Sequence, residues 1–192
     1  MIENKRATPS VYSQRLRLTT WREEHAEPFA RMNADPRVME FFPNSLSREE
    51  SDAVIARIRT HFELHGYGQW AIELRDSGKF IGFVGLSIPS FEAHFMPCVE
   101  IGWRLAYEAW GKGYATEAAL ASLRFGFKDI GLESIVSFTT VTNHRSRRVM
   151  ERLGMTHDPA DEFLHPNLPE GHPLRPHILY RISKTEWLRS IS

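Results

Sequence analysis

The stretch EIGWRLAYEAWGKGYATEAA, residues 100–119, contains three local patterns in direct succession. Its first part alternates large apolar residues such as Trp103 and Leu105 with small or polar ones, as a strand with one buried face does. Gly111 and Gly113 then enclose a lysine, which predicts a tight turn, and the alanine-rich sequence after them predicts a helix. Backbone N–H groups in such a turn converge with the positive end of the helix dipole, so this order predicts a bound phosphate.

The glycine turn has three other interpretations. A dinucleotide-binding site needs a third glycine where this chain has Thr116, and its acidic ribose partner should follow the next strand, whereas Glu133 precedes it. A P-loop needs G-x-x-x-x-G-K-[ST], a string that the sequence lacks. A tight turn with no ligand stays open for a G-x-G motif taken alone.

The rest of the chain alternates strand and helix patterns. Ser47 and Glu50 have the spacing of a capping box and predict the start of a helix, and the Gly-containing turn RDSGK predicts a β-hairpin. We therefore expect an α/β fold with a mixed sheet and helices packed on it. The predicted strands are 13–21, 69–74, 80–88, 98–105, 135–141 and 177–182, and the predicted helices are 22–33, 48–65, 115–129, 144–153 and 183–190, with a Pro- and His-rich loop over 157–177.

Two of these helices carry more specific expectations. In the helix 115–129, the apolar residues Leu120, Leu123, Phe127 and Ile130 are expected on one buried side. Asn143 is expected to cap the next helix, and Gly154 to end it.

Composition restricts the function classes. The 192 residues contain 24 Lys plus Arg and 24 Asp plus Glu, so the formal net charge is zero, which disfavours nucleic acid and anionic membranes as partners. The start of the sequence does not have the pattern of a secretory signal, and no apolar run reaches the roughly 20 residues of a membrane helix. With a single cysteine, Cys98, no internal disulfide can form, and we expect a cytoplasmic protein with no bound metal.

Residues 99–155 resemble the GNAT superfamily of acyl-coenzyme A N-acyltransferases, in particular its branch of ribosomal-protein N-terminal acetyltransferases. The resemblance rests on EIGWRLAYEAWGKGYATEAALASLRFGF followed by TTVTNHRSRRVMERLGM, and it extends to LRLTTW and DPRVMEFF nearer the start. It implies one domain over 1–192, with a mostly antiparallel sheet of about seven strands, splayed between strands 4 and 5, and helices on both faces.

The resemblance also implies a donor, acetyl-coenzyme A, and places it on named residues. The pyrophosphate would lie on backbone amides of residues 110–115, where Trp110 departs from the family's usual Gln or Arg. The pantetheine arm would lie beside the strand that holds Trp103 and Leu105, like an added strand. The residues predicted to bind the coenzyme are Trp103, Leu105, Trp110, Gly111, Lys112, Gly113, Tyr114, Ala115, Thr116, Asn143 and Ser146.

Acyl transfer to an amine requires a base and a proton donor for the leaving thiolate. The resemblance places Glu100 in the cleft as base or water-positioning residue, with a surface carboxylate as the alternative. Many relatives use a tyrosine as the acid, but Met150 occupies that position, so Ser146 is the predicted acid and Tyr114 a weaker candidate. A serine that only bonds to the backbone remains the alternative for Ser146.

The acceptor is predicted only as a primary amine, either a protein N-terminal α-amine or a small molecule. An α-amine is favoured because roughly 30% of it is neutral near pH 7.4, against about 0.1% of a lysine amine. A different acyl donor, a coenzyme-binding sensor without turnover, and a homodimer all stay compatible with the sequence.

Several other side chains were assigned two roles each. Phe41, Phe42 and Trp70 are candidates for an acceptor pocket or for the core, and Cys98 for an acyl carrier or an inert thiol. The basic side chains of the helix after Asn143 are candidates for a solvated face or for the 3'-phosphate of the coenzyme; these are Arg145, Arg147, Arg148 and Arg152.

Overall fold

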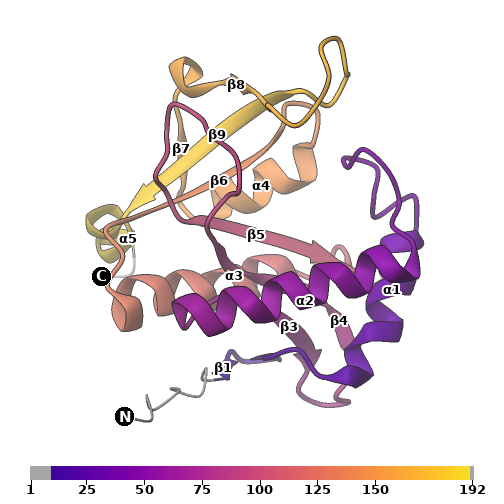
Figure 1. Cartoon of the computed structure of the whole chain (residues 1–192). Helices are drawn as coiled ribbons and strands as arrows, with labels where there is room; N and C mark the ends of the chain where they lie inside the picture. The colour runs from indigo at the N-terminus through magenta and orange to yellow at the C-terminus, as the bar shows by residue number, and fades with distance from the viewer. Residues whose placement is uncertain (1–9, 191–192) are drawn as a thin grey trace, which may run out of the picture.

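The computed structural model describes residues 10–190, and its elements form one twisted sheet with helices on both sides (Figure 1). The strands are β1 Val11–Tyr12, β2 Leu16–Thr19, β3 Gln69–Leu74, β4 Phe80–Ser87, β5 Glu100–Leu105, β6 Ser134–Thr140, β7 Thr156–His157, β8 Phe163–Leu164 and β9 Pro176–Ser183. The α-helices are α1 Ala26–Ala34, α2 Arg48–His65, α3 Tyr114–Arg124, α4 His144–Arg152 and α5 Lys184–Ser190. Short 3₁₀ turns are η1 Glu23–His25, η2 Tyr107–Ala109 and η4 Pro159–Asp161, and η3 Phe125–Ile130 is a π-helix.

The sheet is antiparallel except at one junction. Its order is β1-β2-β3-β4-β5-β6-β9-β7, with β8 also paired to β9. Only β5 and β6 run parallel, and they pair at a single position, Glu100 opposite Val136. The predicted mostly antiparallel sheet with a splay after its fourth predicted strand is therefore confirmed.

The described part of the sheet has nine strands rather than about seven. The additional ones, β1, β7 and β8, have two residues each, too short to show an alternating pattern. Two of them correct the prediction of a Pro- and His-rich loop over 157–177, because β7 and β8, at its start and within it, both pair with β9.

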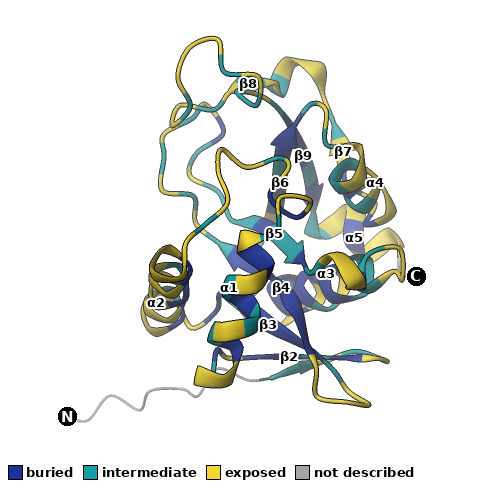
Figure 2. Cartoon of the chain, turned by 90° about the vertical axis from the view of Figure 1, so that its right-hand side faces the viewer, coloured by how far each residue is buried: buried dark blue, intermediate teal, exposed yellow. Residues whose placement is uncertain are grey.

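The helices cover the sheet from two sides (Figure 2). α1 and α2 pack against each other on one side, and α3 packs on the other side against β4 and β5. The start of α2 confirms the predicted capping box, since Ser47 Oγ accepts from the Glu50 N–H and the Glu50 carboxylate accepts from the Ser47 N–H. None of the helices between residues 10 and 190 is both long and apolar enough to cross a membrane.

The predicted helix 115–129 needs two corrections. Leu120 is 42% exposed, because α3 turns its small side, including Ala118 and Ala119, toward the sheet. The α-helix also ends at Arg124 and continues as the π-helix η3, in which Gly126 packs closely against the sheet. A Cβ on Gly126 would lie 2.9 Å from Ile135 Cδ1, so a larger residue here would force neighbouring side chains to shift.

Candidate active site

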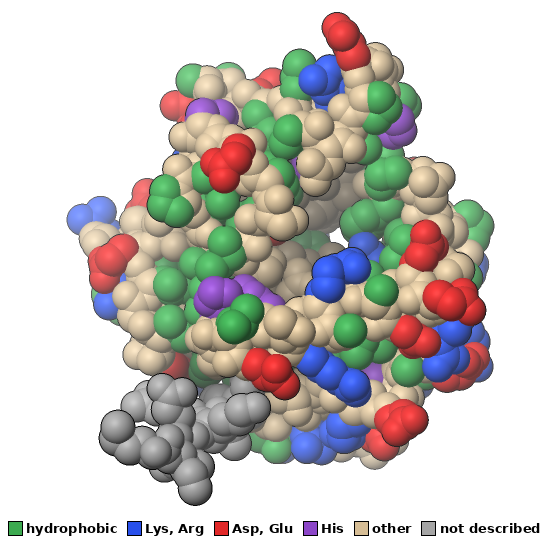
Figure 3. Space-filling model, in the orientation of Figure 1, with side chains coloured by type: hydrophobic (Ala, Val, Ile, Leu, Met, Phe, Trp, Pro, Cys, Tyr) green, Lys and Arg blue, Asp and Glu red, His purple; other side chains and the backbone are tan. Residues whose placement is uncertain are grey.

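The splay between β5 and β6 opens into a cavity of about 840 Å³. Figure 3 shows a hollow near the centre of the face that is turned toward the viewer. Its walls come from β5, the turn before α3, β6, α4, the segment 38–43 and the loop 165–174. A hollow of this size, between strands that do not pair, is large enough for a small-molecule ligand.

The glycine turn forms one wall of the cavity. Gly111 and Gly113 have φ angles of +72° and +79°, a left-handed conformation that other residues adopt at a cost. Gly113 is the N-cap of α3, and no side chain within residues 10–190 caps this helix end. The first turn of α3 therefore presents backbone N–H groups and the positive end of the helix dipole to the cavity, as an anion site requires.

The edge of β5 beyond Glu100 forms a second wall. Gly102, Trp103 and Leu105 pair with β4 on one side but have no paired partner on β6. Ser137, on β6, closes the start of the gap by donating a buried hydrogen bond of 2.8 Å to the Ile101 carbonyl. This edge of β5 is suited to an extended ligand that pairs as an added strand, except at the Leu105 carbonyl, which already accepts from Trp110 Nε1 at 2.9 Å.

Glu100 lies where the two strands part, and it lines the cavity. Burial raises the pKa of its carboxyl to about 7, because the surroundings disfavour the charged form. The strand alternation places Gly102 next to it on the same face, and a Cβ there would lie 3.6 Å from Glu100 Oε1. Glu100 is thus a partly buried carboxyl that lines the cavity, rather than a carboxylate on the open surface.

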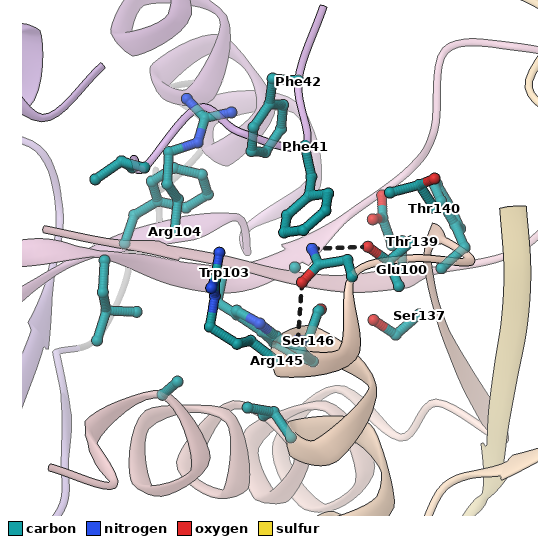
Figure 4. Close-up of a pocket in the computed structure, with 18 of the residues that line it drawn as sticks. Phe41, Phe42, Glu100, Trp103, Arg104, Ser137, Thr139, Thr140, Arg145 and Ser146 are labelled. Carbon is teal, nitrogen blue, oxygen red and sulfur yellow. Dashed lines mark hydrogen bonds between the residues drawn. The ribbon is translucent and has the colours of Figure 1, made fainter. Parts of the chain in front are cut away.

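Asn143 and Ser146 lie together at the start of α4. Figure 4 shows Ser146 there, near Arg145. Asn143 Oδ1 accepts from the Ser146 N–H at 3.1 Å, which confirms the predicted cap, and Asn143 Nδ2 donates to Thr139 Oγ1 at 3.1 Å. The cap uses the backbone of Ser146 and leaves its hydroxyl for the cavity, which Ser146 lines. Met150, at the position of the usual tyrosine, is 1% exposed in the core.

Comparison with known proteins assigns the family. Residues 15–156 match the family described as "Acetyltransferase (GNAT) domain". The chain belongs to the GNAT acetyltransferase family. Its members transfer an acetyl group from acetyl-coenzyme A to an amine, and this chain is an N-acetyltransferase.

Relatives of this GNAT acetyltransferase support the same assignment. The FsC-acetyl coenzyme A-N(2)-transacetylase of Aspergillus fumigatus is 28% identical over 197 residues, which span 96% of this chain and 80% of the relative. An acetyltransferase structure from Agrobacterium tumefaciens superposes with a TM-score of 0.72 at 26% identity, covering 91% of this chain and 94% of the other. A Vibrio cholerae structure assigned as a ribosomal-protein-serine acetyltransferase shares the fold, with a TM-score of 0.74 at 19% identity and coverage of 92% and 98%.

Most of the residues predicted to bind the donor of this acetyltransferase are brought together. Lys112 is the exception among them, since it borders a separate small hollow instead of the main cavity. Those that line the main cavity are Trp103, Leu105, Trp110, Gly111, Gly113, Tyr114, Ala115, Thr116, Asn143 and Ser146.

The structure also bears on three side-chain sets for which the sequence left two roles open: Phe41 with Phe42, Trp70, and Cys98. Phe41 and Phe42 line the cavity of the acetyltransferase, but Trp70 is fully buried in the core between Phe62 and Phe125. Burial raises the pKa of the Cys98 thiol to about 11, so this residue is a protonated thiol at neutral pH.

The basic residues of α4 form two groups, one that lines the cavity and one that does not. Arg147 donates to the Val141 carbonyl at 3.3 Å and does not line the cavity. Arg145, Arg148 and Arg152 do line it. Arg145 also pairs with Glu40, and this ion pair joins α4 to the segment 38–43 across the cavity.

Sequence reasoning missed two charged residues of the acetyltransferase cavity, Arg57 on α2 and Arg104. Arg104 lies on β5, as Glu100 does, but an arginine inside an alternating strand is normally a solvent-facing residue, so nothing in the pattern distinguished it. His165 and His177 also line the cavity, with ring centroids 4.9 Å apart. Burial lowers the pKa of His177 to about 4, which keeps this wall uncharged at neutral pH.

Proposed function

We propose that residues 1–192 form one acyltransferase domain that moves the acetyl group of acetyl-coenzyme A to a primary amine, by direct attack through a tetrahedral intermediate. The acceptor is a protein N-terminal α-amine or a small-molecule amine. The observation that carries the proposal is the partly buried Glu100, which sits at the strand split of a GNAT fold with a carboxyl pKa of about 7.

The cavity walls fit the donor. Backbone N–H groups of residues 110–115 bind its pyrophosphate, with Thr116 adding a hydroxyl. The free edge of β5 at Trp103 and Leu105 pairs with the pantetheine arm. The thioester end lies beside Asn143 and Ser146. The fit is supported by the left-handed glycines, the uncapped helix end and the unpaired strand edge.

Glu100 accepts the proton of the attacking amine, directly or through a water molecule. With a pKa of about 7, roughly 70% of this carboxyl is ionised at pH 7.4, so the base form dominates while proton exchange stays easy. A carboxylate of ordinary pKa would be a weaker base.

Ser146 relays a proton to the leaving thiolate: its hydroxyl gives a proton to the sulfur and takes one from water in the same step, so that no alkoxide is left. Its N–H is already held by Asn143, which fixes the residue while the hydroxyl stays unused by the cap. Met150 cannot take this role, because it is a buried thioether. Cys98 takes no part as an acyl carrier, because its raised pKa keeps the thiol protonated.

The test is a thiol-release assay with acetyl-coenzyme A against N-terminal peptides, amino acids, polyamines and aminoglycosides. We expect release that depends on one amine class. Tight coenzyme binding without release across the whole panel would reject the proposal in favour of a coenzyme-binding sensor, and release only with a longer acyl-coenzyme A would replace the donor.

A further inference from the structure

The charges that line the cavity are strongly unbalanced. Glu100 is its one acidic lining residue within the described chain. The cationic ones are Arg57, Arg104, Arg145, Arg148 and Arg152. A cavity with this balance favours anionic ligands over cationic ones.

Arg104 differs from the other four because it is deeply desolvated. Burial lowers its pKa to about 10, since the surroundings disfavour the guanidinium charge. Among residues 10–190 it forms no ion pair; Nη1 donates to the neutral Asn33 Oδ1 at 2.8 Å, and Nε has no partner. Its guanidinium lies 4.0 Å from the ring centroid of Phe42. The Phe42 and Phe83 rings cover part of the guanidinium, but no carboxylate of the described residues neutralises it. Burying a charge is costly unless the charge is paired, so this cation at the cavity favours an anionic group of the ligand as its partner.

The place of Arg104 on β5 relates it to Glu100. β5 pairs with β4 in continuous register, so Glu100, Gly102 and Arg104 share one face. Four residues of strand separate the two charged ones by about 13 Å between Cα atoms. Gly102 lies between them and has no side chain, so this face of β5 carries none between Glu100 and Arg104. Figure 4 shows Arg104 on the same side of β5 as Phe42, with Trp103 on the opposite side.

We propose that the acceptor carries a carboxylate, which Arg104 binds while the acceptor amine lies at Glu100. The inference rests on the proposed function and narrows it to amino acids, ω-amino carboxylates and peptides with a carboxylate a few bonds from the reactive amine. A planar guanidinium matches a carboxylate in a two-point contact. His177 offers no competing cation, because it is neutral at pH 7. Polyamines are disfavoured, because their second cation would meet Arg104.

The experiment compares matched acceptors in the thiol-release assay. Each ω-amino acid of three to six carbons is set against its carboxamide, the corresponding diamine and an aminophosphonate of similar length. We expect kcat/KM for the carboxylate to exceed that for the carboxamide by about 10- to 100-fold, the range of a charged hydrogen bond. Equal turnover of carboxylate and carboxamide, or a preference for the diamine, would overturn the inference. A preference for the phosphonate would mean that the site recognises a phosphate-like group instead of a carboxylate. This result would also overturn the inference.

Substitutions of Arg104 test whether this residue causes the preference for a carboxylate acceptor. In Arg104→Gln the ratio of kcat/KM for carboxylate to that for carboxamide should fall to about 1, and Arg104→Lys should be intermediate because it keeps the charge without the planar guanidinium. Arg31→Gln is the matched control, since Arg31 is 72% exposed on α1 and outside the cavity. If no amine releases thiol, the proposed function fails, and calorimetric binding of glutarate to the coenzyme-saturated protein tests the site alone. Equal binding by wild type and Arg104→Gln would then overturn the inference.

Discussion

Two walls of the cavity differ in the kind of atoms they present. The turn at Gly111 and Gly113 offers backbone N–H groups, all supplied by one continuous segment. The opposite wall offers side chains from segments far apart in the sequence, including Phe42 before α2 and Arg104 on β5. A backbone site is encoded as a local motif, whereas a side-chain site is encoded by the fold that assembles it. We propose that the glycine turn binds the donor, and that Phe42 and Arg104 belong to the part of the cavity that binds the acceptor.

The largest expected effect is a loss of turnover when Glu100 is replaced. We expect Glu100→Gln to lower kcat by about 10²- to 10⁴-fold, because the base is lost, while the coenzyme dissociation constant stays within a few-fold. Steady-state kinetics and calorimetry measure the two quantities. Glu133→Gln is the control, since Glu133 has a side chain that is 85% exposed. A Glu100→Gln enzyme with normal kcat would remove the carboxylate from the mechanism.

The pH dependence of kcat/KM tests the assignment of Glu100 as the base. Because the base acts when deprotonated, kcat/KM of wild type should rise with pH through an apparent pKa near 7, and Glu100→Gln should lack that limb. The raised pKa also lies above the unfolded value, so the carboxyl costs stability as pH rises from about 4.5 to 7. Thermal unfolding should therefore show Glu100→Gln more stable than wild type at pH 8, by up to about 3 kcal/mol, with the difference disappearing near pH 4. A difference that does not vary with pH would contradict the pKa assignment.

The next effect is on the donor wall. Gly113→Glu should weaken coenzyme binding by about 100-fold or more, because a left-handed backbone is strained by a side chain and the new carboxylate repels the pyrophosphate. Gly131→Glu is a closely matched control: its φ is +81°, against +79° at Gly113, and a Cβ there meets nothing within 4 Å. Equal losses of affinity in both variants would mean that strain alone is responsible, and unchanged affinity in Gly113→Glu would remove the turn from the donor site.

A smaller effect is expected at Ser146. Ser146→Ala should lower kcat about 10-fold without changing the melting temperature, because the Asn143 cap bonds to its backbone N–H and survives the substitution. Thiolates of lower pKa need less help in leaving, so the defect should shrink with a donor whose thiol is more acidic. A loss of stability with unchanged kcat would make Ser146 a capping residue only.

The smallest effect is expected at Cys98. Cys98→Ser should leave kcat/KM within about twofold, since a thiol with a pKa of about 11 carries no acyl group at neutral pH. Mass spectrometry after incubation with acetyl-coenzyme A alone should show no acetylated Cys98. Acetylation at this residue, with loss of turnover in the variant, would replace direct attack by a two-step mechanism.

The local parts of the fold could be predicted from the sequence because their signals are local. The capping box of Ser47 and Glu50 marked the start of α2, and the hairpin turn joined β3 to β4. The glycine turn predicted a phosphate ligand for the same reason. The family resemblance, carried by residues 99–155, added the splay and the donor.

The rest depended on tertiary contacts that have no local pattern. Leu120 was expected in the core, but α3 turns its alanines to the sheet instead. Trp70 and Phe42 are both aromatic, yet one is core and the other lines the cavity. Arg104 became visible only when packing showed its charge to be desolvated and unpaired, which no periodicity encodes.

The hydrogen bond from Ser137 Oγ to the Ile101 carbonyl has a thermodynamic consequence. It satisfies a buried carbonyl at the point where strand pairing stops, so the gap beyond it does not begin with an unpaired polar group. A ligand that lies along the edge of β5 therefore need not supply a donor for this carbonyl, and covering the gap leaves no unpaired acceptor at Ile101.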